Sequence, residues 1–333
     1  MLFSFRLNRA IKAAEKYLTA QVMSGEYGLK CVGLSNDPKF SNEKGHLFSI
    51  FFITSAFQDR IPELLRTIFI TRILSEEQNE YWGYSPRGYY PGDEDNPFFV
   101  DADDTAFALR SLRQLGVYRS PNSLKGFLTE VEINSKDTQL FTTFKKPEKK
   151  TIQTNPSFEN NFGVHPEVNG NIYNCLLETD MQNLLSLNFI ETTQTSRGFW
   201  PSYFYPNVYY STNQFLQVLQ KTQTLSNSVK QAQTFLVQSK GTIGGWSAKE
   251  DPLTAAWAMG GLAKTGTPPL KSDISELIRS QKPNGSWKSD QVIWQFTDDK
   301  EDIWKAYDNN RVIATASCLS TLKEAQLTLG QGN

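Results

Sequence analysis

Two kinds of hydrophobic segment alternate along the chain, and both are long enough to form helices. In the first kind, apolar residues recur every three or four positions, which is the period of a helix with one buried face. These amphipathic helices are predicted at about 5–20, 62–75, 122–132, 181–193, 226–239 and 272–281. In the second kind most positions are apolar, as in a helix that is buried on all sides. These apolar helices are predicted at about 46–58, 103–115, 170–187, 210–221, 253–264 and 311–324.

A short pattern recurs where the amphipathic segments end: a Gln, a Gly four residues later, and an aromatic residue two residues after the Gly. Complete copies begin at Gln21, Gln194 and Gln281, and Lys240 takes the Gln position in a fourth copy. The copy near Gln78 keeps only the aromatic residue, Tyr84, at the expected offset. An apolar residue lies four positions before the Gln in every copy: Tyr17, Leu74, Ile190, Leu236 and Leu277.

The physical chemistry of these residues predicts how each copy folds. Glycine adopts the left-handed conformation that commonly ends a helix. The Gln side chain can bind backbone groups that have no partner at a helix end. We therefore predict a helix that ends at the Gln, a turn at the Gly, and an aromatic side chain that packs back on the helix end.

The alternation of the two helix types predicts an all-α fold, an α/α barrel of about six helical hairpins. The apolar helices would form an inner ring and the amphipathic helices an outer ring. The length of 333 residues suits a single barrel domain over residues 1–333. Residues 145–170 form the longest irregular segment and are predicted as an exposed loop or a lid.

Composition excludes several classes of protein. The net charge of -1 argues against a nucleic-acid partner, because binding to phosphates needs an excess of Lys and Arg. Three cysteines are too few and too scattered for a disulfide framework. The sequence starts without a signal-peptide pattern and has no run of 18 apolar residues, so we expect a cytoplasmic protein. Its oligomeric state is left open.

The sequence also contains a dense group of carboxylates, six within the range 93–104. Asp93, Glu94 and Asp95 fit an exposed acidic loop. The segment Asp101-Ala102-Asp103-Asp104 differs, because Phe98-Phe99-Val100 precedes it and an apolar helix follows it. An acidic N-cap and first turn would be the purely structural interpretation of this segment.

Carboxylates crowded into an apolar environment cannot all ionise, so at least one should retain a proton near neutral pH. A protonated Asp is a Brønsted acid that can protonate an alkene, and the resulting carbocation needs a dry pocket with aromatic faces. Aromatic residues make up 13% of the chain. The candidates for such a pocket are Phe99, Trp200, Phe204, Tyr209, Trp257, Trp294, Trp304 and Tyr307, for each of which core packing is the alternative.

The segment Asp101-Ala102-Asp103-Asp104-Thr105-Ala106, together with the repeated Gln-x3-Gly-x-Trp pattern, resembles the class II terpene cyclases, which include the squalene–hopene cyclases. The resemblance implies that Asp103 is the proton donor and that Asp101 and Asp104 tune its protonation. It also implies an isomerase that cyclises a linear prenyl chain.

Two further segments resemble the same family. Residues 168–175 are similar to a stretch in which a His hydrogen-bonds the donor, and Asn171 occupies that place here. An amide can hold a carboxyl group, but it cannot carry charge as a His can. Residues 198–212 are similar to a stretch in which a Tyr belongs to the reprotonation path, which implies this role for Tyr210.

Family members usually have two or three helical domains, whereas this chain has the length of one. In this it resembles the single-domain meroterpenoid cyclases, which implies a geranylgeranylated dihydroxybenzoate as the substrate and no cofactor. Such a hydrophobic substrate also favours a peripheral contact of the protein with a membrane. A copalyl-type cyclase of a prenyl diphosphate, which would need magnesium, and a non-catalytic barrel that binds prenyl lipids are the alternatives.

Other sequence signals compete with this interpretation. The segment Asp298-Asp299-Lys300-Glu301-Asp302 matches the short pattern with which class I synthases bind magnesium and a diphosphate. An exposed acidic loop is the preferred explanation, because no matching second metal motif lies nearby. A protein prenyltransferase β-subunit would need a zinc site, and neither His46 nor His165 has a convincing Cys partner, so no metal site is predicted. A glycoside hydrolase would also use paired carboxylates and aromatic platforms.

Overall fold

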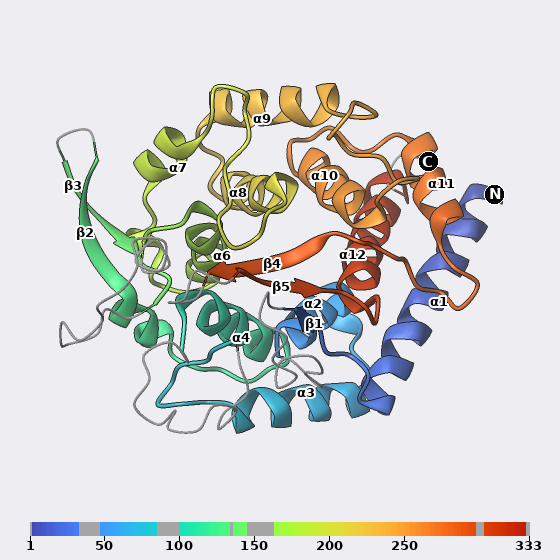
Figure 1. Ribbon diagram of the computed structural model, residues 1–333, viewed down its shortest axis with the longest axis horizontal. Coiled ribbons are helices and arrows are strands. Elements are labelled where there is room, and N and C mark those ends of the chain that lie inside the picture. The colour runs from blue at the N-terminus through green and yellow to red at the C-terminus, as the bar shows by residue number, and fades with distance from the viewer. Residues whose placement is uncertain are drawn as a thin grey trace.

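The protein is mostly helical, as the sequence predicts, and its helices fall into two sets (Figure 1). The computed structural model describes residues 2–32, 47–84, 100–133, 136–144, 163–297 and 303–330. The central helices are α2 (Leu47–Phe57), α4 (Ala102–Gln114), α6 (Pro166–Leu176), α8 (Val208–Thr222), α10 (Pro252–Lys264) and α12 (Val312–Gly330). Each central helix contacts the next along the chain, and α12 contacts α2, so the contacts form a closed cycle.

The peripheral helices lie around this cycle (Figure 1). They are α1 (Leu2–Ser24), α3 (Glu63–Ser75), α7 (Leu187–Thr193), α9 (Ser226–Gln238) and α11 (Lys271–Ser280), with the short 3₁₀ segments η2 (Gln58–Arg60), η5 (Pro121–Phe127) and η7 (Gln182–Leu184). Helices α1, α3, α9 and α11 each contact at least one central helix. The chain therefore alternates between peripheral and central positions over most of its length.

Burial distinguishes the two sets in the way that their hydrophobic patterns predict. On peripheral α1 the buried residues recur every three or four positions: Leu7, Ala10, Ile11, Ala14, Leu18 and Val22. On central α10, every residue from Pro252 to Leu262 is buried. A central helix therefore tolerates polar groups only where these have specific partners.

The repeated pattern folds into a turn that is fixed by hydrogen bonds. The indole N–H groups of Trp200, Trp246 and Trp287 each donate to a backbone carbonyl ten residues earlier, at 2.7 Å. Those carbonyls belong to Ile190, Leu236 and Leu277, the apolar positions of the pattern. The aromatic side chain therefore packs back on the end of the preceding helix, as predicted.

The Gln of the pattern reaches further than its own helix. Gln194 donates from Nε2 to the carbonyl of Gly198 and to that of Ser228 on α9, each at 2.9 Å. Gly198 has a φ of +93°, and a Cβ at this position would lie 2.3 Å from the Gln231 carbonyl oxygen. Only glycine fits there, because the turn presses directly against the backbone of the next peripheral helix.

In the copy near Gln78 the aromatic residue was assigned wrongly from the sequence. Trp82, not Tyr84, is fully buried and donates from its indole to the Ile73 carbonyl at 2.7 Å. The spacing between the two residues is nine instead of ten, so the six-residue offset misses it. Tyr84 instead contacts Trp294, with ring centroids 4.2 Å apart.

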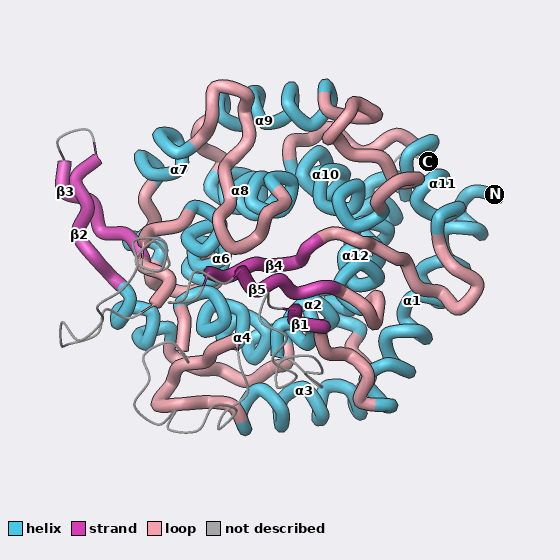
Figure 2. Tube along the Cα trace, in the orientation of Figure 1, coloured by secondary structure: helices cyan, strands magenta, loops and turns pink. Residues whose placement is uncertain are grey.

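Two small sheets accompany the helices, and the sequence prediction did not include them. Strands β1 (Lys30–Val32), β5 (Ile303–Tyr307) and β4 (Val292–Thr297) pair in that order, and all neighbours are antiparallel. Figure 2 shows this sheet, in magenta, crossing the middle of the view between the central helices. The backbone N–H of Gln295 donates to the Phe204 carbonyl at 2.7 Å, which ties β4 to the loop before α8.

The helix predicted at 122–132 is wrong. Residues of that range form η5 and then strand β2 (Leu128–Ile133), which pairs with β3 (Lys136–Phe141) in an antiparallel hairpin. Val131 and Ile133 are half-buried while Glu130 and Glu132 are exposed, an alternation typical of a strand. Of the irregular segment predicted at 145–170, residues 145–162 lie outside the described residues, and α6 begins at Pro166.

Among the described residues, no helix is long and apolar enough to cross a membrane.

Candidate active site

Central helix α4 begins at the carboxylate cluster. Asp101 is the N-cap residue, and its Oδ1 accepts the backbone N–H of Asp104 at 2.7 Å. The backbone N–H of Asp101 donates to the Trp82 carbonyl at 3.0 Å, and that of Ala102 donates to the Thr143 carbonyl at 2.8 Å. The capping role predicted by the structural interpretation therefore belongs to Asp101, which leaves Asp103 and Asp104 in the first turn.

Asp103 is bound by side chains from two other parts of the chain. The Asn171 amide on α6 donates from Nδ2 to Asp103 Oδ1 at 2.6 Å. The Tyr205 hydroxyl, from the loop before α8, donates to the other oxygen, Oδ2. Tyr210 on α8 donates in turn to Asn171 Oδ1 at 3.0 Å. Each oxygen of the Asp103 carboxyl group therefore has one neutral donor, and no cation pairs with it in the described residues.

Burial strongly affects the ionisation of this cluster. Asp101, Asp103 and Asp104 expose only 5%, 6% and 4% of their surface. Burial, followed by the charge of Asp101 and that of Glu167, raises the pKa of Asp103 well above its usual value, against the opposing hydrogen bonds from Tyr205 and Asn171. Burial also raises the pKa of Asp101 to about 6, although hydrogen bonds from the helix backbone oppose the change. The cluster can therefore hold a proton in conditions where an exposed Asp would be ionised.

Asp104 is the member of the cluster with the fewest partners. Its Oδ1 is buried and has no hydrogen-bond partner in the described part of the chain. Burial, followed by the charges of Asp101 and Asp103, raises the pKa of Asp104 well above its usual value. A protonated carboxyl group is favoured here, because a buried anion without donors is unstable.

A fourth buried carboxyl group, Glu167, lies in the first turn of α6 and is fully buried. Its Oε1 accepts the backbone N–H groups of Tyr203 at 2.8 Å and Phe204 at 2.7 Å. Burial raises the pKa of Glu167 to about 7, although these N–H groups oppose the change. Sequence reasoning missed this residue, because an acidic residue in a first turn is ordinary helix chemistry.

An aromatic cluster surrounds the partners of Asp103. Tyr205 and Tyr210 lie with ring centroids 4.4 Å apart. Tyr205 stacks on Phe48 of α2 at 5.8 Å, and Tyr210 meets Trp257 of α10 edge to face at 5.1 Å. Phe52 lies 6.3 Å from Tyr210. Helices α2, α8 and α10 thus contribute aromatic faces to one region beside the acid, and such faces can stabilise a cation.

The structure brings Asp101, Asp103, Asp104, Asn171, Tyr210 and Trp257 together, but it distributes the other predicted residues differently. Trp200 packs on Phe215, with centroids 5.2 Å apart, and takes part in the repeated turn. Tyr209 stacks on Phe235 of peripheral α9 at 5.4 Å. Both residues have the contacts expected of packing between helices.

Phe204 and Trp294 lie at the side of the site where β4 passes. Phe204 contacts the His165 ring edge to face at 4.9 Å. Its backbone N–H donates to Glu167, and its carbonyl accepts the backbone N–H of Gln295. Trp294 contacts Tyr84, and its indole nitrogen is buried without a hydrogen-bond partner among the described residues.

Of the remaining predicted pocket residues, Trp304 and Tyr307 belong to β5, where Trp304 pairs with Phe296 and Tyr307 with Val292. Phe99 lies outside the described residues.

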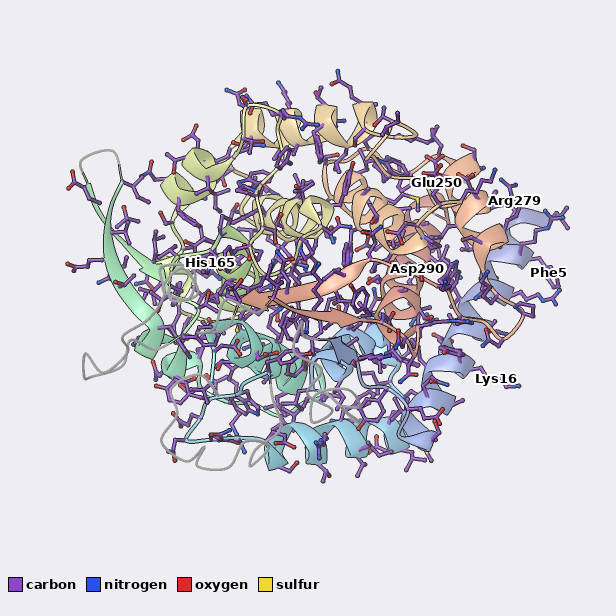
Figure 3. All side chains as sticks on the ribbon, in the orientation of Figure 1. Phe5, Lys16, His165, Glu250, Arg279 and Asp290 are labelled. Carbon is purple, nitrogen blue, oxygen red and sulfur yellow. The ribbon has the colours of Figure 1, made fainter. Side chains whose placement is uncertain are left out.

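Of the residues considered for a metal or diphosphate site, the structure describes His165 but not His46 or the segment 298–302. His165 is buried, and its Nδ1 lies 2.7 Å from the Thr143 hydroxyl oxygen, so it has a structural partner. Figure 3 labels His165 inside the molecule, between the β2–β3 hairpin and α6. His46 and the segment 298–302 lie outside the described residues. Among the residues described, no group of three His, Cys, Asp or Glu side chains could hold a metal ion.

A separate surface pocket of about 630 Å³ has a different character. Glu250, Arg279 and Asp290, labelled in Figure 3, belong to its lining, together with Lys249, Lys282 and Lys288. Charges of both signs meet there, with no aromatic residue in the lining. Such a surface suits water better than an apolar substrate.

Comparison with known proteins places this geometry in a structural context. No family model matches the sequence, and no curated protein matches it. Among solved structures, the apo form of type II terpene cyclase MstE from Scytonema is similar with a TM-score of 0.70 and 17% identity, over 96% of this chain and 98% of that chain. A variant of the same cyclase in complex with geranylgeranyl dihydroxybenzoate, its substrate, has a TM-score of 0.67 and 16% identity, over 96% and 97%.

A second kind of cyclase is similar over less of its length. For ent-copalyl diphosphate synthase from Streptomyces platensis the TM-score is 0.56 with 17% identity, and the match covers 84% of this chain but 50% of that chain. At such identities the likeness is one of fold. The chain has the fold of type II terpene cyclase structures over nearly its whole length.

Proposed function

We propose that this protein is a class II terpene cyclase, an isomerase that folds a linear prenyl chain into fused rings by proton-initiated cyclisation. We further propose that residues 1–333 form one α/α barrel, with the central helices as the inner ring and the peripheral helices as the outer ring. The closed cycle of contacts from α2 through α12 supports this description. The Asp101–Asp104 segment and the repeated Gln-x3-Gly-x-Trp turn would then be the two sequence signatures of the family.

The observation that carries the proposal is the environment of Asp103. This carboxyl group is buried, its pKa is raised, and it lies among aromatic rings from three central helices. In the first step its O–H proton would add to the terminal double bond of the prenyl chain, which forms a C–H bond and leaves a tertiary carbocation and an Asp103 carboxylate. Neighbouring double bonds would attack the cation in turn, and loss of a proton from the last cation would make the product an isomer of the substrate.

The neighbours of Asp103 have separate roles in this scheme. Asp101 would stay bound to the helix N-terminus, while its charge raises the proton affinity of Asp103. Asp104 would contribute in the same way when ionised. Asn171 would hold the carboxyl group in place, and Tyr210 would orient Asn171. The rings of Tyr205, Tyr210, Trp257, Phe48 and Phe52 would stabilise the cation, with Trp294 towards β4.

For the substrate we propose a geranylgeranylated dihydroxybenzoate. Its support is the match to the MstE structures, which covers almost all of both chains and includes a complex with this compound. A prenyl diphosphate is the second candidate, because the ent-copalyl diphosphate synthase structure also shares the fold. No cofactor is proposed for the benzoate, whereas a diphosphate would require magnesium. A barrel that only binds a prenyl lipid is the non-catalytic alternative.

The direct test is to incubate the purified protein with geranylgeranyl dihydroxybenzoate and to analyse the mixture by mass spectrometry and NMR. We expect a cyclic product of unchanged mass. Asp103→Asn is the matched control, because it keeps the shape and the hydrogen-bonding oxygen but has no acidic proton. It should lower the rate by about 10³-fold. Substantial turnover by Asp103→Asn would exclude Asp103 as the donor.

A second arm distinguishes the substrates. Cyclisation of the benzoate should survive EDTA, because no metal takes part in the scheme. Activity only with geranylgeranyl diphosphate, and only when magnesium is present, would replace the benzoate with the diphosphate. Recovery of both compounds unchanged but bound to the protein would favour the non-catalytic lipid-binding alternative.

A further inference from the structure

The loop between Trp200 and α8 delivers a hydroxyl group to the proposed acid. Residues 201–207 form no regular helix or strand, so the backbone itself does not fix the position of Tyr205. Nevertheless Tyr205 is buried, and its hydroxyl donates to Asp103 Oδ2. Another part of the structure must therefore fix the loop.

Glu167 provides that constraint. One of its oxygens, Oε1, accepts two consecutive backbone N–H groups, those of Tyr203 and Phe204, immediately before Tyr205. The next backbone group, the Phe204 carbonyl, accepts from Gln295 of β4. The loop is thus bound from α6 on one side and from β4 on the other. A carboxylate that accepts backbone N–H groups makes stronger hydrogen bonds than a neutral acceptor does.

We propose that Tyr205 and Glu167 are positioning residues that together set the acidity of Asp103, an inference that rests on the proposed function. Tyr205 would stabilise the Asp103 carboxylate that forms when the proton leaves. Glu167 would act in two ways: its Oε1 would hold the loop that carries Tyr205, and its charge would favour the protonated form of Asp103.

The two effects on Asp103 have opposite signs. A hydroxyl donor strengthens its hydrogen bond when the acceptor becomes charged, so it favours the ionised acid and lowers the pKa of Asp103. Glu167 raises the pKa of Asp103 by repulsion between like charges. Such a balance lets an acid remain protonated in the resting enzyme and still release its proton to an alkene, which is a weak base.

Other titratable groups also lie around Asp103. Asp101 and Asp104 face it from α4, and Tyr210 faces it from α8. Burial raises the pKa of both Tyr205 and Tyr210 well above the usual value, so neither carries charge in the working pH range. Asn171 already occupies the other oxygen of Asp103 but is linked to α6 and not to the loop. Tyr205 is therefore the partner of Asp103 that depends on Glu167.

The test compares four variants: Tyr205→Phe, Glu167→Ala, Glu167→Gln and the double variant Tyr205→Phe/Glu167→Ala. Glu167→Gln is the matched control for charge, because the side-chain oxygen of Gln can still accept both backbone N–H groups. The rate constant kcat for geranylgeranyl dihydroxybenzoate is measured against pH. In parallel, the ionisation of Asp103 is followed by NMR in protein carrying ¹³C-labelled aspartate carboxyls, with Asp103→Asn identifying the signal.

We expect Tyr205→Phe to lower kcat about tenfold. It should also move the alkaline limb of the profile, and the Asp103 titration, upward by about one pH unit, because it removes a hydrogen bond that favours the ionised acid. Glu167→Ala should also lower kcat and move the Asp103 titration upward. The upward shift should be smaller than in Tyr205→Phe, because loss of the Glu167 charge lowers the pKa of Asp103. The double variant should be no slower than the slower single variant. Glu167→Gln should instead keep kcat within a few-fold and move the titration downward.

Unchanged Asp103 titration in Tyr205→Phe would overturn the role of Tyr205. Identical behaviour of Glu167→Ala and Glu167→Gln would overturn the role of the loop contact. Because the NMR titration needs no turnover, it also distinguishes this inference from the proposed function. If the Asp103 titration shifts as expected but the protein cyclises neither substrate, the proposed cyclase function is refuted and the positioning roles of Tyr205 and Glu167 are not.

Discussion

Two central helices begin beside a buried aspartate, and the two aspartates have different partners. At the start of α12, Asp308 exposes 3% of its surface and accepts the backbone N–H groups of Val312 and Ala314, each at 2.7 Å. At the start of α4, Asp103 exposes 6% of its surface, and its donors within the described ranges are two side chains, the Asn171 amide and the Tyr205 hydroxyl. Position in the fold and burial are similar, so the partners make the difference.

The partners decide which carboxyl group can serve as an acid. Burial raises the pKa of Asp308 to about 6, but three backbone N–H groups and Arg311 oppose the change. Among the described residues, no cation and no helix-end N–H acts against the rise in the pKa of Asp103, and the charges of Asp101 and Glu167 add to it. The helix end therefore limits the rise in the pKa of Asp308, whereas the charges beside Asp103 add to the rise in its pKa. Burial alone does not make a Brønsted acid, because donors from a helix N-terminus stabilise the anion.

The largest effect that would test this contrast is on stability, at α12. Asp308→Ala removes the acceptor for two buried N–H groups, so we expect the free energy of unfolding to fall by about 3 kcal/mol. Denaturant unfolding followed by circular dichroism measures this change. The folded fraction should keep its cyclisation rate, because Asp308 does not contact Asp103 or its partners. Loss of the rate per folded molecule would contradict the structural role of Asp308.

Much of the acidic site could be predicted from the sequence, because its residues are contiguous or belong to recognisable segments. Asp101, Asp103 and Asp104 share one helix turn, and Asn171 and Tyr210 lie in segments that resemble those of a known family. Tyr205 and Glu167 could not be predicted in this way. Their roles depend on a loop with no regular backbone and on contacts between residues 36 and 37 positions apart, which no local pattern encodes.

For the fold, hydrophobic periodicity predicted most of the helices, but the helix predicted at 170–187 ends at Leu176, and the one predicted at 181–193 begins only at Leu187. It failed at 122–132, where cross-strand pairing with β3 decides the conformation, and it gave no sign of β4 and β5. For the tryptophans, the sequence could indicate that aromatic residues are enriched, but not which of their side chains lie beside the acidic site. Trp257 meets Tyr210, while Trp200 belongs to a helix-end turn, and only the packing of α8 and α10 distinguishes the two.

The side-chain partners of Asp103 can be tested at Asn171. Asn171→Leu keeps the approximate volume but removes the donor to Asp103 and the acceptor of Tyr210. We expect kcat to fall by about 10²-fold, equivalent to about 2.7 kcal/mol, because the acid is no longer held in one orientation. Rate measurements with saturating substrate give this value.

Asn174 provides the control on the same helix. It is equally buried, and its amide donates to the carbonyls of Gly170 and Gln214 instead of to the acid. Asn174→Leu should lower the stability but leave kcat of the folded protein nearly unchanged. Equal losses of kcat in the two variants would indicate that Asn171 acts only through packing.

The pH dependence of stability offers a smaller effect with a defined sign. The pKa of Glu167 is raised to about 7 in the folded protein from a usual value of 4.5. Its proton therefore stabilises the fold fully below pH 4.5, and this stabilisation is lost as the pH rises through 7. Asp101 and Asp308, each raised to about 6, add to the loss at lower pH. Between pH 5 and pH 7 we expect the free energy of unfolding to fall by about 2 kcal/mol from Glu167.

Denaturant unfolding at a series of pH values measures this slope. Glu167→Gln should flatten the whole part between pH 5 and pH 7, while Asp308→Asn should flatten mainly the part below pH 6. A wild-type stability that increases from pH 5 to pH 7 would contradict the raised pKa values of these buried groups.

The smallest expected effect extends the comparison to two buried tryptophans. Trp287 belongs to the α12 end: its indole donates to the Leu277 carbonyl at 2.7 Å, and its backbone N–H donates to Thr315 on α12 at 3.1 Å. Trp257 faces the acidic site, where it meets Tyr210.

Trp287→Phe should lower the free energy of unfolding by about 1 kcal/mol through loss of the indole hydrogen bond, with the product unchanged. Trp257→Phe keeps an aromatic face but weakens its attraction for a cation, so it should change the rate or the distribution of products more than the stability. Unfolding curves and product analysis of the two variants should therefore show opposite patterns, because one ring supports a helix end and the other lies beside the developing charge.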